Sequence, residues 1–250
     1  MTNAPAAALH EPAWVTLSSA DPQAAATFYQ AVLGWELSEA DEQVHASAAG
    51  LPVAAIVDSA GDASRWLLHI EVDDIATAMD AVTRAGGSTP FPPRVEIDPA
   101  VAVVADSSGT RFGLHKSGAQ PHGRSSSPGA FAWGELITDD PVTSAAFCNA
   151  AFGWHLSGPE GPLGRREWRL HGRAVSGLLP RPPAMPAETP AYWDVYFAVT
   201  DLDGAVATAA ERAATPLLPP TPIEIGTIAV LLDPAGAIFT LIQPSTEAHA

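Results

Sequence analysis

The sequence contains an internal repeat, and this repeat constrains the fold more than any other feature. Residues of the first half recur in the second half at two constant spacings. At a spacing of 119 (133 minus 14), the recurring residues are Trp14, Leu17, Asp21, Pro22, Phe28, Gly34, Trp35, Leu37 and Ser38, which match Trp133, Leu136, Asp140, Pro141, Phe147, Gly153, Trp154, Leu156 and Ser157. At a spacing of 127 (193 minus 66), they are Trp66, Val72, Asp106, Gly109 and Leu114, which match Trp193, Val199, Asp233, Gly236 and Leu241. A repeat this long predicts two copies of one domain. Residues shared by both copies are then expected to be architectural, and residues confined to one copy are candidates for local chemistry.

Each copy carries the local signals of two βαβββ units in succession. Asp21-Pro22 predicts a helix start, because Asp caps free backbone N–H groups and proline is tolerated in the first turn. Gly34 predicts the end of that helix, and a second helix is expected from Asp74 to Gly86-Gly87. Alternating bulky and small residues predict the strands. In the first copy these span residues 14–19, 35–37, 44–49, 53–57, 66–72, 95–97, 100–105 and 111–115.

The repeat and the local composition together predict the domain boundaries. The stretch 116–129 is rich in glycine, serine and proline, as linkers are. A proline-rich insertion, 180–190, is expected to form a stiff exposed loop in the second copy. The predicted organisation is a flexible N-terminus (1–11), a first domain (12–116), a linker (117–129), a second domain (130–244) and a tail (245–250).

Composition excludes several classes of partner. The formal net charge is −16, from 28 acidic and 12 basic residues, which disfavours binding to nucleic acid or to an anionic membrane. Cys148 is the only cysteine, so no internal disulfide can form. The sequence shows neither a secretory signal nor an apolar stretch of transmembrane length. We therefore expect a cytoplasmic protein, a monomer or a homodimer, whose partner is a small-molecule metabolite.

The paired units resemble the vicinal oxygen chelate superfamily, which includes glyoxalases, bleomycin-resistance proteins and extradiol dioxygenases. The segments that carry the resemblance are 21–35, 72–87, 105–109 with 112–114, and 233–236. The resemblance covers both copies and is closest to the tandem-domain, glyoxalase-like branch. It implies an α+β fold of two tandem domains. In each, a pair of βαβββ units forms an open, curled mixed sheet with helices outside, around a cupped site.

The same resemblance implies where a divalent metal would be held. The corresponding positions are Trp14, Leu67 and Gly113 in the first copy and Trp133, Asp194 and Thr240 in the second. Of these six side chains only Asp194 ligates a metal well, because an indole offers an N–H donor and no lone pair. We therefore expect neither a metal nor another cofactor. An alternative is a metal site shifted by two residues, in which His69, His115 and a carboxylate converge on the same strand faces.

Strand parity identifies the residues expected to face the two cups. In the first copy these are Trp14, Thr16, Leu67, His69, Glu71, Arg111, Gly113 and His115; in the second they are Trp133, Glu135, Asp194, Tyr196, Ile238 and Thr240. The two indoles suit stacking on a flat aromatic ligand, or they plug the cups as core residues. The catalytic candidates are His69, Glu135, Asp194 and Tyr196. His69 would serve as a base near neutral pH. Glu135 and Asp194 would form an acid–base pair, and Tyr196 would donate a hydrogen bond to an oxyanion. The remaining cup residues are predicted to contact the ligand. Either one cup is active and the other structural, or each cup is a composite of both copies.

Three functions are compatible with these features. The first is a metal-independent enzyme, or an enzyme accessory, in the tailoring of a medium-sized apolar or aromatic secondary metabolite. The second is a binding protein that sequesters such a compound, as resistance proteins of the superfamily do. The third is a metal-dependent lyase or dioxygenase that uses the shifted site.

Overall fold

The computed structural model describes residues 9–40, 43–90, 100–118, 123–161 and 163–245. The first copy contains β1 (Pro12–Ser19), α1 (Pro22–Leu33), β2 (Glu36–Ala40), β3 (Gln43–Ala48), β4 (Leu51–Asp58), β5 (Arg65–Val72), α2 (Ile75–Arg84), β6 (Val101–Ala105) and β7 (Arg111–Lys116). The second contains β8 (Phe131–Thr138), α3 (Pro141–Phe152), β9 (His155–Leu156), β10 (Arg166–Leu170), β11 (Arg173–Pro180), β12 (Tyr192–Ala198), α4 (Leu202–Glu211), β13 (Thr215–Ile223), β14 (Gly226–Leu232) and β15 (Ile238–Pro244). The strand expected at 95–97 lies outside the described residues.

The strands form two mixed sheets, one from each copy, as the sequence predicts. The first sheet has the order β2-β3-β4-β1-β5-β7-β6, and the second β13-β14-β15-β12-β8-β11-β10-β9. In each sheet the two βαβββ units meet along one antiparallel pair, β1 with β5 and β8 with β12. Parallel pairs flank these central strands: β1 with β4, β5 with β7, β8 with β11 and β12 with β15. Across the described strands both sheets stay open and neither closes into a barrel.

The recurring aspartates and glycines are architectural. Each of the four helices in the described residues begins after an Asp whose carboxylate accepts a backbone N–H three residues on, at 2.9–3.0 Å. Gly34 ends α1 in the left-handed conformation with φ of 70°, and an L side chain rarely adopts this φ. Asp106 and Asp233, the equivalent residues of the last turns, each accept two backbone N–H groups of their own turn. Several of the residues that recur in both copies are therefore helix caps or turn residues.

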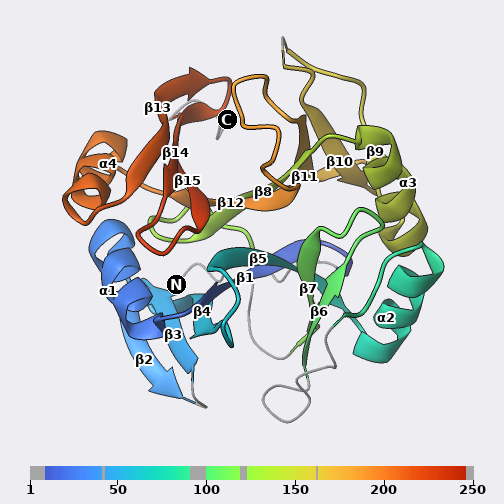
Figure 1. Ribbon diagram of the computed structural model, residues 1–250, viewed down its shortest axis with the longest axis horizontal. Coiled ribbons are helices and arrows are strands. Elements are labelled where there is room, and N and C mark those ends of the chain that lie inside the picture. The colour runs from blue at the N-terminus through green and yellow to red at the C-terminus, as the bar shows by residue number, and fades with distance from the viewer. Residues whose placement is uncertain (1–8, 41–42, 91–99, 119–122, 162, 246–250) are drawn as a thin grey trace.

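The two sheets pack back to back (Figure 1). α1 lies beside α4 at one side of this sandwich and α2 beside α3 at the other. One continuous apolar core joins the copies and includes Val15, Leu17, Leu68, Val195 and Phe197. The face of each sheet that points away from this core is its cup, and the two cups lie on opposite sides of the molecule (Figure 1).

Buried polar contacts connect the copies within this core. The Tyr29 hydroxyl donates to Asp233 Oδ2 at 2.9 Å and accepts from Trp66 Nε1 at 2.9 Å. The equivalent tryptophans Trp35 and Trp154 are fully buried, and each indole donates to a backbone carbonyl oxygen of a distant segment at 2.7 Å. These repeated tryptophans therefore support the architecture.

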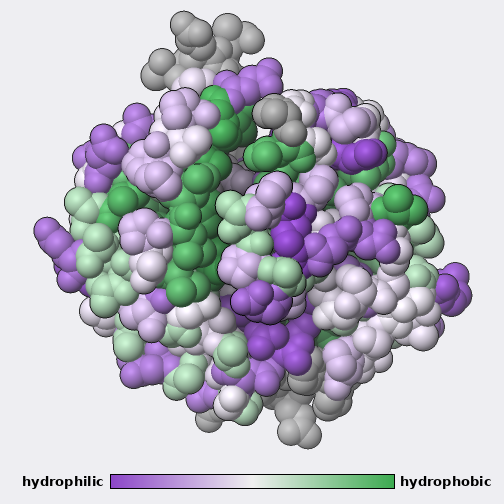
Figure 2. Space-filling model, turned by 45° about the horizontal axis from the view of Figure 1, so that its top comes forward, coloured by the Kyte–Doolittle hydropathy of each residue, from purple (hydrophilic) through white to green (hydrophobic). Residues whose placement is uncertain are grey.

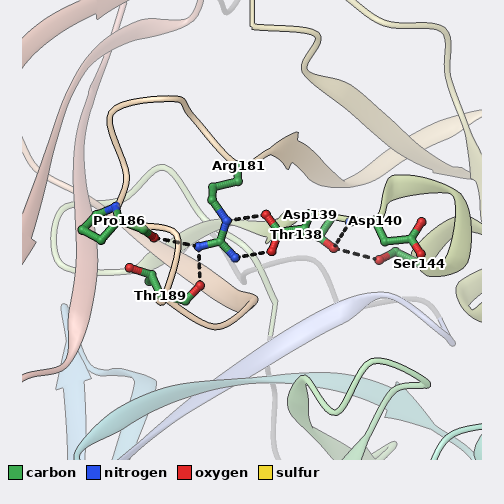
Figure 3. A network of polar contacts seen from close by, with 7 residues as sticks. All are labelled: Thr138, Asp139, Asp140, Ser144, Arg181, Pro186 and Thr189. Atoms are coloured by element: carbon green, nitrogen blue, oxygen red, sulfur yellow. Dashed lines mark hydrogen bonds and ion pairs between the residues drawn. The ribbon is translucent and has the colours of Figure 1, made fainter.

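The insertion between β11 and β12 is fixed by one arginine (Figure 3). The guanidinium of Arg181 makes a bidentate ion pair with Asp139 on one side. On the other side it donates to the carbonyl oxygens of Pro186 and Thr189. The segment predicted as a stiff loop is thus anchored to the end of β8 by side-chain contacts.

No helix in the part of the chain that the structure describes is long and apolar enough to span a membrane.

Candidate functional site

A pair of carboxyl groups lies at the floor of the second cup. Glu135 on β8 is directly opposite Asp194 on β12 in the antiparallel register, so both side chains are on one face of the sheet. Each residue is only 3% exposed. Like charges placed directly opposite each other are unfavourable, and burial makes two charged carboxylates costlier still. The pair therefore requires compensation by neighbouring groups or by a proton.

Two donors hold Glu135 in place. Arg165, in the loop before β10, donates from Nε to Glu135 Oε1 at 2.6 Å. The hydroxyl of Tyr196 donates to Glu135 Oε2 at 2.9 Å. Each carboxylate oxygen of Glu135 thus accepts one hydrogen bond, one of them from a cation. Burial lowers the pKa of Arg165, but the charge and hydrogen bond of Glu135, together with Tyr196 and Glu167, raise it overall.

Asp194 has a different environment. The hydroxyl of Thr240 on β15 donates to Asp194 Oδ2 at 2.7 Å, while Oδ1 is buried and makes no hydrogen bond with any residue that the structure describes. Burial raises the pKa of Asp194 to about 7, opposed by the Thr240 hydrogen bond and reinforced by the charge of Glu135. Near neutral pH this carboxyl group therefore exchanges a proton, beside a carboxylate whose donors stabilise its charge.

One wall of the second cup is apolar. Tyr196, Ile228 and Ile242 form a buried cluster, against which Trp133 and Leu218 pack. Figure 2, with the second copy turned toward the viewer, shows hydrophobic side chains on the side of β13 and β14 and hydrophilic ones across from them. The cup thus combines an apolar wall with a polar floor, as small-molecule sites commonly do.

Trp133 is half-buried at this wall, and its indole contacts a residue of the linker. The guanidinium of Arg124 lies 4.7 Å from the centre of the Trp133 ring. The indole N–H of Trp133 is buried and has no hydrogen-bond partner within the described chain. One face of the Trp133 indole thus stacks on the guanidinium of Arg124, and the indole N–H is available to donate a hydrogen bond.

Each cup has a glycine beneath a polar side chain. In the second cup a Cβ on Gly177 of β11 would overlap the carboxylate of Glu135. In the first cup a Cβ on Gly113 of β7 would overlap the imidazole of His69. Both glycines are therefore needed so that the neighbouring side chain can lie flat over the sheet.

The first cup lacks the carboxyl pair. The residues equivalent to Glu135, Asp194 and Tyr196 are Thr16, Leu67 and His69. His69 and His115 are buried on the cup face, as is Trp14, which borders a small pocket with Leu51, Val53, Ser125 and Phe131.

Two further predicted contact residues lie toward the margin of the first cup. Arg111 forms an ion pair with Asp62 at 2.7 Å on the surface. Burial raises the pKa of Glu71, opposed by a hydrogen bond to Ser117 and reinforced by Glu11 and Asp73. The strands that carry the predicted cup residues of each copy belong to the sheet of that copy.

The residues present do not fit the metal that the superfamily resemblance implies. Trp14, Leu67 and Gly113 supply no good ligand in the first cup, and in the second Asp194 and Thr240 hydrogen-bond each other. Among the described residues, no three His, Cys, Asp or Glu side chains lie close enough together to hold a metal ion. His69, His115 and a carboxylate are thus not gathered into the shifted site.

Comparisons with known proteins agree with the fold. A family model described as a glyoxalase-like domain matches residues 14–115. CFP32 of Mycobacterium tuberculosis, named as a candidate glyoxylase, is 32% identical over 252 residues, which cover 94% of this chain and 95% of that protein. The anthracycline biosynthesis protein DauV of Streptomyces sp. strain C5 is 28% identical, with 93% and 92% covered.

Solved structures show the same architecture. The Mn(II)-bound glyoxalase from Novosphingobium aromaticivorans superposes with a TM-score of 0.66 at 18% identity, covering 94% of this chain and 82% of that one. The 2,2',3-trihydroxybiphenyl 1,2-dioxygenase of Sphingomonas wittichii gives 0.65 at 16% identity, with 97% and 94% covered. The chain therefore belongs to the glyoxalase-like family of the vicinal oxygen chelate superfamily.

Sequence reasoning missed three residues of the second cup. Arg165 lies in a loop, and its contact with Glu135 joins positions 30 residues apart. Arg124 belongs to the linker, and Gly177 depends on the pairing of β8 with β11. Only Gly177 had a usable signal, because a glycine within a strand indicates close approach of another group.

Proposed function

We propose that the protein binds a medium-sized, flat aromatic metabolite in its second cup and moves a proton on that metabolite without a metal ion. The observation that carries this proposal is the Glu135–Asp194 pair, buried beside an apolar aromatic wall. The first cup has no such pair at the equivalent positions, Thr16 and Leu67.

The environments of the two carboxyl groups suit acid–base chemistry. Arg165 and Tyr196 donate to Glu135, which makes it the base, whereas Asp194 holds a proton near neutral pH and is the acid. Glu135 removes a proton from the ligand, Asp194 supplies one, and Trp133 holds the aromatic plane. Two relatives are named for anthracycline biosynthesis, which supports a role in making small molecules.

The first part of the test is binding. Chelator-treated protein, its metal content checked by elemental analysis, is titrated with 1,3-dihydroxynaphthalene while tryptophan fluorescence is followed. We expect one site per chain. Trp133→Leu should abolish binding and Trp14→Leu, the equivalent change in the first cup, should leave it intact. Binding that requires added Mn²⁺ or Fe²⁺, or that is lost with Trp14→Leu alone, would contradict the proposal.

The second part of the test is proton transfer. In D₂O, proton NMR follows the replacement of the ring hydrogen at C2 of 1,3-dihydroxynaphthalene by deuterium. The protein should accelerate this exchange, and Glu135→Gln should remove at least ~99% of the acceleration, the usual scale of a general base, while binding survives. Tight binding with no accelerated exchange would instead support the sequestering role.

A further inference from the structure

The floor of the second cup contains polar groups that neither the fold nor the proposed proton transfer accounts for. Asp194 Oδ1 is buried and unpartnered among the described residues, although the other oxygen of the same carboxyl group is held by Thr240. The indole N–H of Trp133, two residue pairs further along the same two strands, is also buried without a hydrogen-bond partner among the described residues. Buried polar atoms are nearly always hydrogen-bonded, so two on one face of one cup point to a ligand atom.

The charged neighbours decide which ligand atom fits. Asp194 is faced by Glu135 from β8, by Tyr192 and Tyr196 from its own strand, and by Thr240 from β15. Arg165, the cation of this group, is already bound to Glu135. A second anion would therefore be repelled, and an apolar atom would leave Oδ1 unsatisfied. The unpartnered indole N–H of Trp133 can only donate, and the carboxylic acid form of Asp194 donates as well, so a neutral acceptor suits both groups.

We infer that the ligand of the second cup is an aromatic ketone or quinone, whose carbonyl oxygen accepts a hydrogen bond from the carboxylic acid of Asp194. This inference rests on the proposed function and names its substrate class. The ring plane lies against Trp133 and the Ile228–Ile242 wall, and the carbonyl edge points to the floor. The carboxylic acid of Asp194 donates its one O–H to the carbonyl oxygen of the ligand, so this hydrogen bond forms without proton transfer.

The experiment compares two probes of equal ring size. Chelator-treated protein is titrated near pH 6 with 9,10-anthraquinone and with anthracene, which has the same three fused rings and no oxygen. We expect anthraquinone to bind about tenfold more tightly, the scale of one buried hydrogen bond. This preference should fall as the pH rises above about 7, because the donor proton is then lost.

Two variants separate the hydrogen bond from the cup itself. Asp194→Leu, which introduces the residue that the first copy has at this position, should bind the two probes with equal affinity. Asp194→Asn, whose amide still donates, should keep the preference and lose its pH dependence. The wild-type protein alone gives an independent readout: the carbonyl stretch of bound anthraquinone should move to lower infrared frequency.

The outcomes distinguish this inference from the proposed function. If the wild-type protein binds both probes equally and the carbonyl stretch does not move, the inference is overturned and aromatic binding in the cup still stands. If neither probe binds to metal-free protein, the proposed function fails and the inference fails with it. A preference that persists in Asp194→Leu likewise overturns the inference.

Discussion

Glu135 and Asp194 face each other across β8 and β12, buried on the same side of the second sheet, and differ in their donors. A guanidinium and a hydroxyl donate to the two oxygens of Glu135, whereas a single hydroxyl donates to one oxygen of Asp194. This asymmetry makes one group a base and its neighbour an acid, and it has a consequence for stability.

The stability of the protein should fall as pH rises through the range in which Asp194 ionises. The unfolded chain loses this proton near its ordinary pKa of 3.8, whereas the folded protein keeps it until about 7. Between these values the folded state binds one more proton, so its free energy of unfolding decreases as pH rises, by roughly 1 kcal/mol per pH unit. Urea denaturation of the wild type and Asp194→Asn measures this contribution. The wild type should lose stability relative to Asp194→Asn as the pH rises from about 4 to about 7; a difference that stays constant over this range would refute the assignment.

Alanine at one glycine of each cup should show which cup is active. Gly177→Ala drives a Cβ into the carboxylate of Glu135, and Gly113→Ala drives one into the imidazole of His69. Both should lower the free energy of unfolding by about 1–3 kcal/mol, as overpacking does. Only Gly177→Ala should abolish binding of 1,3-dihydroxynaphthalene. The reverse pattern, with loss of binding in Gly113→Ala, would move the active site to the first cup.

Tyr29→Phe should weaken the contact between the two sheets. The change leaves Trp66 Nε1 without its acceptor and Asp233 Oδ2 without its donor, both in the buried core. We expect a loss of about 1–3 kcal/mol in the free energy of unfolding, measured by denaturation followed by tryptophan fluorescence. Because one core joins the copies, unfolding should remain a single transition. Two separate transitions in the wild type would contradict this description of the core.

Arg181→Lys should loosen the insertion between β11 and β12 and leave the rest of the protein unchanged. Lysine keeps the charge but cannot bridge Asp139 and the carbonyl oxygens of Pro186 and Thr189 together. Hydrogen-exchange mass spectrometry should show about tenfold faster exchange in peptides covering 182–190. Peptides covering β1 to β4 serve as the control. Unaltered exchange in the insertion would show that the prolines alone fix it.

Local signals in the sequence were sufficient for the helices and for most strands. Asp21 and Gly34 set the bounds of α1 because capping depends only on residues within one turn. The two-residue period of a strand likewise separates Trp14 and Thr16 from the core residues Val15 and Leu17. The repeat then extended each local prediction to the second copy.

Contacts between distant segments could not be predicted in the same way. Tyr29 meets Asp233 only because the two sheets pack back to back, and these residues are 204 positions apart. Arg165 contacts Glu135 across 30 positions of the sequence, and no local signal predicts this contact. The catalytic and binding roles assigned to the cup residues remain predictions for experiment.

The most direct test of this account is a crystal structure of chelator-treated protein soaked with 9,10-anthraquinone. The account predicts the probe in the second cup, stacked on Trp133, with a carbonyl oxygen within hydrogen-bond distance of Asp194 Oδ1 and no metal ion beside it. A probe bound in the first cup, or held through a metal ion in either cup, would contradict the account.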